Sequence, residues 1–217
     1  MAGIAENIRN VRAHIPAHVT LVCVSKFQPV DAIREAYEAG ERHFAESRVQ
    51  ELKNKITQLP DDIHWHFIGH LQTNKVRDLL KIRPYLIHSV DSLHLLEAIN
   101  DEAAKQGITQ DVLIELHTAK EDTKTGFKTE DIERILDFTP DFMQSLRIRG
   151  LMTMATNTDD ETEIRRCFME ISNIKSQISN KDMVLSMGMS DDYRIAIECG
   201  SNMVRIGSSI FGERTYK

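Results

Sequence analysis

Residues 18–29 read HVTLVCVSKFQP, and the way in which this stretch ends separates two parallel folds. Its first part, residues 18–25, is rich in β-branched side chains and predicts a buried strand. An open doubly wound sheet carries a glycine-rich turn after its first strand, which lets a phosphate approach the backbone. Residues 18–29 contain no glycine. The stretch therefore favours the other common parallel architecture, a closed TIM-type (β/α)8 barrel.

The same unit, a short apolar run followed by an amphipathic stretch, recurs along the chain after a first predicted helix at 4–13. Strands are predicted at 18–25, 43–46, 64–69, 86–90, 111–118, 146–154, 183–188 and 203–212. Helices are predicted at 29–40, 47–59, 73–82, 91–107, 129–138, 159–178 and 190–200. No linker or composition break marks a domain boundary, and 217 residues suit a small barrel. We therefore expect one barrel domain over residues 1–217.

The composition argues against several classes of function. The formal net charge is −6, whereas nucleic-acid binding depends on clustered lysine and arginine. Cys23, Cys167 and Cys199 lack the spacing of a disulfide framework or a zinc site and are expected to be small buried hydrophobes. No segment resembles a signal peptide or a membrane span. We expect a cytoplasmic protein that binds neither nucleic acid nor membranes.

Barrels of this kind bind ligands at the carboxyl ends of their strands, and phosphate commonly binds after strands seven and eight. This rule selects VSK at 24–26, GMS at 188–190 and RIGSS at 205–209. Lys26 follows its strand on the same face as Val22 and Val24, and partial desolvation there would make its amine a nucleophile. Taken alone, however, a lysine that marks the strand end and extends into water is the simpler interpretation.

The segments after strands seven and eight suit an anion. Ser190 is predicted to cap the helix at 190–200, and the free amides of that helix could also bind phosphate. Gly188 would let the backbone approach a ligand. Asp191 and Asp192 would repel a phosphate if they pointed inward, so they are expected to face away.

In RIGSS, Gly207 and Ser208 can offer amides and a hydroxyl beside Ser190, although a glycine at a strand end is also explained by a turn. Arg205 on the same strand either forms a surface ion pair or enters the barrel mouth.

The HxH pattern of His64 and His66 leaves a metal-dependent hydrolase open, since both residues share one strand face. The last two strands offer serine, glycine and arginine at the mouth, and Asp191 is the remaining candidate ligand.

Six segments together, VSKFQP, FAESRVQE, WHFIGHLQTNK, RGLMTM, LSMGMSDD and VRIGSSIFGER, closely resemble the pyridoxal phosphate homeostasis protein family (YggS/PROSC type). They stand in the family's order over nearly the whole chain. The resemblance implies a fold-type III barrel similar to the barrel domain of alanine racemase. It also implies pyridoxal 5′-phosphate (PLP) as cofactor.

The resemblance assigns roles residue by residue. It implies a Schiff base between PLP and Lys26, and phosphate contacts from Ser190 and the backbone of Met189. Further phosphate contacts are implied for Gly207 and Ser208.

The resemblance also implies that Arg205 faces the pyridine nitrogen, which would keep that nitrogen unprotonated and weaken the ring as an electron sink. The chain departs from the family pattern at three places. Ser47 replaces an asparagine close to the cofactor, Ala45 replaces a glycine, and His117 stands where many members have asparagine. These departures leave the contacts to the ring open.

The family's implied role is to hold PLP for vitamin B6 and amino-acid homeostasis, without catalytic residues of its own and with apo PLP-dependent enzymes as partners. A monomer is expected. The alternatives are a weak amino-acid racemase and the metal-dependent hydrolase. Related racemases add a β-domain with a second acid/base tyrosine, and we expect no such domain here, because the sequence runs only to Tyr216 and Lys217 after the eighth predicted strand.

Overall fold

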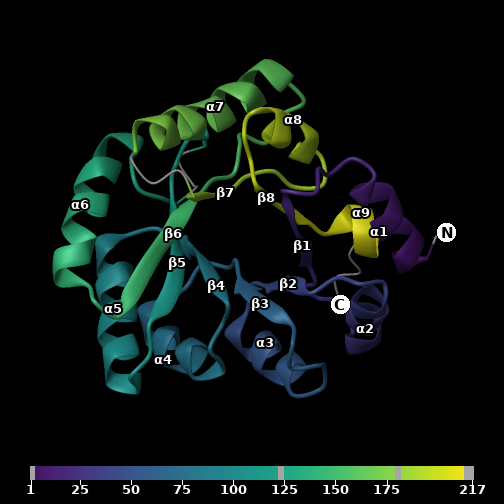
Figure 1. Ribbon diagram of the computed structural model, residues 1–217, viewed down its shortest axis with the longest axis horizontal. Coiled ribbons are helices and arrows are strands. Elements are labelled where there is room, and N and C mark those ends of the chain that lie inside the picture. The colour runs from purple at the N-terminus through teal and green to yellow at the C-terminus, as the bar shows by residue number, and fades with distance from the viewer. Residues whose placement is uncertain (1–2, 122–124, 179–181, 213–217) are drawn as a thin grey trace.

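Eight parallel strands close into a barrel in chain order, with β8 pairing back onto β1 (Figure 1). The computed structural model describes residues 3–121, 125–178 and 182–212. The strands are β1 Thr20–Val24, β2 His43–Glu46, β3 His64–Phe67, β4 Leu86–Val90, β5 Gln110–Glu115, β6 Leu146–Met152, β7 Val184–Ser186 and β8 Met203–Ile206. The helices are α1 Ile4–Arg12, α2 Val30–Glu38, α3 Val49–Ile56, α4 Thr73–Ile82, α5 Leu93–Gln106, α6 Ile132–Phe142, α7 Glu161–Gln177, α8 Tyr193–Glu198 and α9 Ser208–Phe211, with a 3-10 turn at Thr129–Asp131.

The predicted TIM-type barrel is thus confirmed, and the element order agrees with the sequence pattern. The last segment, 203–212, was predicted to be strand throughout, and this is wrong. The amides of Ile210 and Phe211 donate to the Gly207 carbonyl at 3.0 and 2.9 Å, so the chain forms a helical turn, α9, directly after β8. Residues 213–217, on which the expected absence of a second domain depends, lie outside the described residues.

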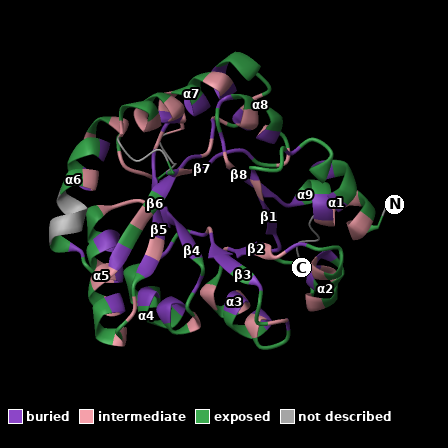
Figure 2. Ribbon diagram, in the orientation of Figure 1, coloured by how far each residue is buried: buried purple, intermediate pink, exposed green. Residues whose placement is uncertain are grey.

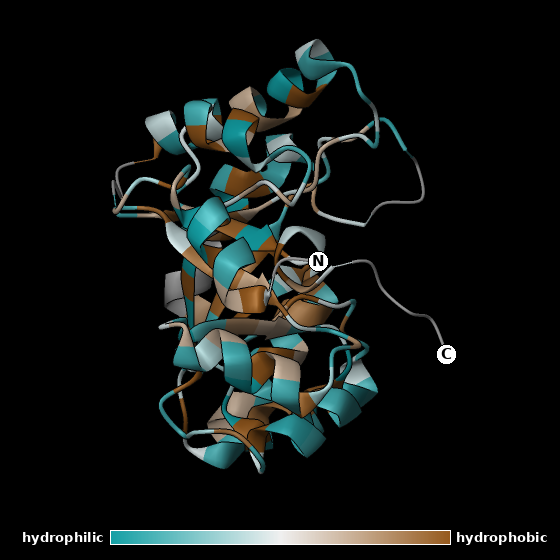
Figure 3. Cartoon of the chain, turned by 90° about the vertical axis from the view of Figure 1, so that its right-hand side faces the viewer, coloured by the Kyte–Doolittle hydropathy of each residue, from teal (hydrophilic) through white to brown (hydrophobic). Residues whose placement is uncertain are grey.

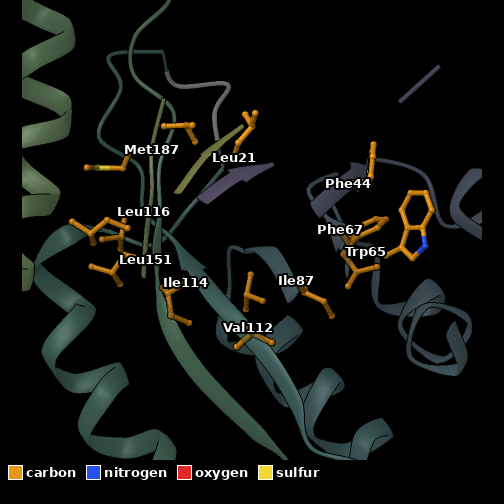
Figure 4. Packing of buried hydrophobic residues seen from close by; sticks show 14 of the residues in the cluster. Leu21, Phe44, Trp65, Phe67, Ile87, Val112, Ile114, Leu116, Leu151 and Met187 are labelled. Carbon is orange, nitrogen blue, oxygen red and sulfur yellow. The ribbon is translucent and has the colours of Figure 1, made fainter. Parts of the chain in front are cut away.

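Strand side chains alternate between two apolar clusters. The larger one lies between strands and helices and includes Phe44, Trp65 and Phe67 (Figure 4). Buried residues follow the strands and the inner helix faces (Figure 2), and the outer helices carry both hydrophobic and hydrophilic residues (Figure 3). All three cysteines are buried and unpaired, as expected. In the described part of the chain, no helix combines the length and apolarity needed to cross a membrane.

The smaller cluster fills the barrel interior. It comprises Val22, Val24, Ala45, Leu86, Leu113, Met152 and Met203. Polar side chains share this interior, where His66, His88, Ser186 and Arg205 are buried as well. Because buried polar groups need hydrogen-bond partners, these residues must satisfy one another inside the barrel.

Candidate functional site

The segments selected from the sequence meet at one arc of the barrel rim. In the ring of strands, β7, β8, β1 and β2 are consecutive neighbours (Figure 1). All strands are parallel, so the residues that follow them gather at the same end. Ser190 follows β7, Gly207 follows β8, Lys26 follows β1 and Ser47 follows β2. The structure therefore brings together four sites that lie far apart in the sequence.

The hydroxyl of Ser190 faces the segment after β8 and does not cap a helix. Helix α8 begins only at Tyr193, so the predicted capping role is wrong. Ser190 Oγ instead accepts weak hydrogen bonds from the amides of Gly207 at 3.3 Å and Ser209 at 3.4 Å. Ser190 and Ser209 also line a hollow of about 580 Å³ between α1, α8 and α9. A hydroxyl and two backbone donors thus converge at one point of the rim, as an anion site requires.

Gly188 allows this convergence. Its φ is +93°, and a Cβ at this position would lie 2.8 Å from Tyr193 Cα and 2.6 Å from Ala196 Cβ. Any larger residue would collide with α8 and force the turn apart. The glycine therefore serves close packing of the loop against α8, which sets the position of Ser190.

The two aspartates after Ser190 differ from each other. Asp191 is exposed and lines the same hollow as Ser190 and Ser209. Asp192 is half-buried, and its Oδ1 accepts the amide hydrogen of Met189 at 2.6 Å, so the expectation that it faces away is wrong. Burial raises the pKa of Asp192, and the bond to Met189 and the charge of Arg205 oppose that shift. The Met189 amide consequently has an acceptor within its own loop.

Lys26 is half-buried and lies in a tight turn just beyond β1. The turn is closed by the amide of Gln28, which donates to the Ser25 carbonyl at 3.0 Å. Phe27 has a φ of +66°, an uncommon value for a residue other than glycine. Its amide donates to Glu51 Oε1 at 2.7 Å. The residues on either side of Lys26, Ser25 and Phe27, are therefore both held in place by hydrogen bonds.

A buried ionic cluster behind this turn supplies the fixing contacts. Lys55 Nζ donates to the Ser25 carbonyl at 2.9 Å, to Glu46 Oε1 at 2.8 Å and to Glu51 Oε1 at 2.6 Å. Ser25 Oγ donates to the same Glu46 oxygen at 2.6 Å. The other oxygen, Glu46 Oε2, is buried without a partner among the described residues. Burial raises the pKa of Glu46 to about 7, against the opposing effects of Lys55 and Ser25.

This cluster was missed from the sequence. A glutamate as the last residue of β2 and a lysine nine positions later in α3 are both ordinary surface choices when read alone. Only the packing of α3 beneath the turn after β1 makes Lys55 buried. A signal was present in the strand pattern, because Glu46 is a charged residue at the end of the predicted short strand 43–46.

Arg205 extends into the barrel and not toward the surface. Only 4% of it is exposed. Its Nη1 donates to the carbonyl and the Oγ of Ser186 at 2.7 and 2.6 Å, and its Nη2 donates to the Thr153 carbonyl at 3.0 Å. Within the described residues it forms no ion pair with a carboxylate. Burial lowers the pKa of Arg205 to about 10, so the side chain remains a cation at neutral pH.

The remaining residues predicted for the site lie in different surroundings. Ser47 is half-buried, and its carbonyl lies so close to Gly69 that a Cβ there would come within 2.0 Å. The Nε2 of His117 lies 3.0 Å from the Glu121 carbonyl. His64 is exposed and His66 is buried inside the barrel. Among the described residues, no three histidine, cysteine, aspartate or glutamate side chains are arranged to hold a metal ion.

Glu115, at the end of β5, is a further buried carboxyl that the sequence did not reveal. Only 4% of it is exposed, and burial, the largest cause, raises its pKa from 4.5 to about 7. Thr125 Oγ1 donates to its Oε1 at 3.4 Å. A carboxyl with a raised pKa makes its full contribution to stability below pH 4.5 and loses it as the pH rises through about 7.

Glu115→Gln should therefore remove part of the pH dependence of folding. Between pH 4.5 and 8 the wild-type free energy of unfolding should fall, relative to the variant, by on the order of 2 kcal/mol. Urea denaturation across that range measures the difference. Glu130→Gln, at a side chain that is 76% exposed, is the control and should follow the wild type. Parallel profiles for wild type and Glu115→Gln would contradict the prediction.

Comparison with known proteins gives concordant matches. A family model described as "Alanine racemase, N-terminal domain" matches residues 1–215. The pyridoxal phosphate homeostasis protein of Helicobacter pylori is 40% identical over 203 residues, which is 93% of this chain and 90% of that protein. The Escherichia coli (strain K12) protein of the same name is 34% identical over 234 residues, covering 100% of this chain and 99% of that protein.

Solved structures agree. PipY of Synechococcus elongatus PCC7942, a member of the COG0325 family, has been solved without PLP. That structure is similar to this chain with a TM-score of 0.89 and 34% identity, and the match covers 96% of this chain and 100% of PipY. The form with PLP bound gives a TM-score of 0.83. Alanine racemase of Clostridium difficile 630 gives a TM-score of 0.80 at 16% identity, covering 99% of this chain and 57% of that enzyme, a likeness of fold alone.

Proposed function

The chain belongs to the alanine racemase N-terminal domain family, among the pyridoxal phosphate homeostasis proteins, and from that premise we propose that it binds PLP and acts in PLP homeostasis. PipY, to which it is similar over nearly its whole length, has been solved with PLP bound. The proposal includes a covalent link through a Schiff base on Lys26. It places this activity in the cytoplasm, in a single barrel domain that acts as a monomer.

The observation that carries the proposal is the convergence of Ser190 Oγ with the amides of Gly207 and Ser209. These groups are held together by weak bonds of 3.3 and 3.4 Å, and phosphate oxygens are stronger acceptors than a hydroxyl. In the proposal Ser190, Gly207 and Ser208 bind the phosphate. Met189 takes part only if its amide leaves Asp192.

The guanidinium of Arg205 fits a ring nitrogen that carries no proton. In the described residues the guanidinium donates three hydrogen bonds, all to oxygens. They use both N–H groups of Nη1 and one N–H group of Nη2. Its Nε–H and the second Nη2–H have no hydrogen-bond partner in the described part of the chain. Either can donate to the ring nitrogen, and a cation beside it keeps that nitrogen unprotonated. Ser47, after β2, is the proposed neighbour on the other side of Lys26.

PLP supplies an aldehyde that condenses reversibly with a primary amine and releases water. The turn around Lys26 presents such an amine at the rim, beside the segment after β8 whose residues are proposed to bind the phosphate. Fixing Ser25 and Phe27 limits where the amine can reach, which favours reaction with a correctly placed aldehyde. Reversible capture of a reactive aldehyde is the chemistry that homeostasis needs, and apo PLP-dependent enzymes are the proposed recipients.

We propose no catalytic residues for this chain. A weak amino-acid racemase is the alternative that the shared barrel favours, although the alanine racemases resemble it in fold only, at 15–16% identity. Assays of the PLP-loaded protein for D-amino acids decide between the two. Turnover that depends on Lys26 would replace the carrier function with an enzymatic one.

Reduction of the PLP-loaded protein tests the covalent link. Borohydride should abolish the visible absorbance, and peptide mapping should place the reduced PLP on Lys26. In a second assay, PLP should reach an apo-enzyme faster than free PLP dissociates from the protein. Reduced PLP spread over surface lysines would argue against a dedicated site.

A further inference from the structure

Four histidines and one serine lie in series from the surface into the barrel, and we call them the histidine chain. The separations are 3.4 Å for His64 Nδ1 and His43 Nε2, 2.9 Å for His43 Nδ1 and His66 Nε2, 2.8 Å for His66 Nδ1 and His88 Nε2, and 3.0 Å for His88 Nδ1 and Ser186 Oγ. The residues come from β2, β3, β4 and β7. The rings of His43, His66 and His88 therefore use both of their nitrogens, and the ring of His64 uses Nδ1.

The histidine chain runs from solvent to Arg205. At its outer end, the exposed ring of His64 stacks on Tyr85 with centroids 4.4 Å apart and planes at 10°. At its inner end, Ser186 Oγ accepts a hydrogen bond of 2.6 Å from Arg205. His64 is the first residue of β3, so the outer end opens at the amino-terminal end of the barrel, opposite the rim that carries Lys26.

The inner rings are uncharged at neutral pH. Burial, the largest cause, lowers the pKa of His66 and of His88 well below 6.5, and it lowers that of His43 to about 4. A neutral imidazole has one N–H donor and one acceptor nitrogen. In an unbroken series of such rings, every ring must therefore donate in the same direction.

The contacts of Ser186 fix that direction. Its Oγ accepts from Arg205, so its own hydrogen needs an acceptor, and within the described residues the remaining contact of this oxygen is His88 Nδ1. If His88 Nδ1 carried the hydrogen instead, the buried hydroxyl would lack an acceptor, at a cost of about 1–3 kcal/mol. Ser186 must therefore donate to His88, which carries its hydrogen on Nε2 and donates to His66. His66 donates to His43 in the same way.

We infer that the histidine chain is a row of aligned imidazole dipoles that positions Arg205 and stabilises its charge. The unprotonated nitrogens of His43, His66 and His88 lie toward the guanidinium, and their N–H groups point away from it. Arg205 needs this support, because neutral oxygens are its only hydrogen-bond partners in the described residues. His88 and Ser186 are thus positioning residues, and their effect on a PLP ring rests on the proposed function.

Nitrogen-15 NMR of the protein without PLP tests the inference directly. Long-range proton–nitrogen correlations should show His43, His66 and His88 as Nε2–H tautomers at pH 7. A hydrogen on Nδ1 of His88, or a mixture of tautomers in the buried rings, would overturn it. This measurement needs no variant and no cofactor.

Ser186→Ala separates Arg205 from the histidine chain and leaves every ring in place. The Arg205 N–H groups should exchange with solvent about tenfold faster, and the single tautomer of His88 should be lost. Ser201→Ala is the matched control, since Ser201 is also buried but its hydroxyl contacts, among the described residues, only backbone carbonyls, those of Leu185, Met187 and Met203.

Unchanged exchange and an unchanged His88 tautomer in folded Ser186→Ala would contradict the inference. If that variant does not fold, the wild-type tautomers still decide. PLP titration forms a separate arm, in which Ser186→Ala should bind about tenfold more weakly than Ser201→Ala. Failure of the wild type to bind PLP would count against the proposed function and leave the tautomer assignment intact.

Discussion

Lys26→Ala should lose the visible absorbance of the PLP-loaded protein and retain PLP at least about a hundredfold more weakly. The reason is that the phosphate and ring contacts remain but the covalent link is absent. Ultrafiltration followed by absorbance measures retention, and borohydride should then fix no PLP to the protein. The fold should be unaffected, because Lys26 is only half-buried at the rim and its side chain contributes little to packing.

Lys81→Ala is the control for this experiment. Lys81 is exposed near the end of α4. Its replacement also removes one positive charge but leaves the rim unchanged. It should bind PLP as the wild type does. Equal retention by the Lys26 and Lys81 variants would remove Lys26 from the site.

Lys55→Met should lower the free energy of unfolding by about 3 kcal/mol or more at pH 8. Glu46 would then be a buried carboxylate whose remaining partner is Ser25 Oγ. The carbonyl of Ser25 would lose a donor as well. Since burial already raises the pKa of Glu46 to about 7, the lone carboxyl should take up a proton in acid, and the loss should be smaller at pH 5. Urea denaturation at both pH values measures it.

Two further variants isolate the cause. Lys53→Met removes an exposed lysine from the same helix and should change stability by less than about 0.5 kcal/mol. Adding Glu46→Gln to Lys55→Met removes the stranded charge and should restore about half of the loss. No recovery in the double variant would show that lost packing, and not a lone charge, explains the effect. Weaker PLP retention by Lys55→Met would connect the cluster to Lys26.

Much of the fold could be predicted because it depends on local patterns. Apolar runs such as residues 18–25 and 86–90 predict strands wherever they occur, and their alternation with amphipathic stretches gives the barrel. Element ends were less accurate. The helical turn after β8 contains Ile210 and Phe211, whose apolar character continues that of the strand, so pattern alone extended the strand through it.

The candidate site divides in the same way. Lys26, Ser190, Arg205 and Gly207 could be selected from the sequence because a barrel places strand ends at one rim, and their roles stay predictions. The partners that fix them were not found. Ser186 and His88 lie 98 residues apart in the chain and 3.0 Å apart in the barrel, and no local pattern records such a pair.

The sequence alone determined the order of strands and helices, the closed parallel barrel and the residues that reach its carboxyl-terminal rim, because periodicity and strand ends are local properties. Tertiary structure alone decided which buried groups meet. It turned the hydroxyl of Ser190 toward Gly207, placed Lys55 beneath the turn that carries Lys26, and joined four histidines to Arg205. The reason is physical. A buried polar atom must find its partner in three dimensions, and that partner comes from whichever strand or helix the closed barrel brings beside it.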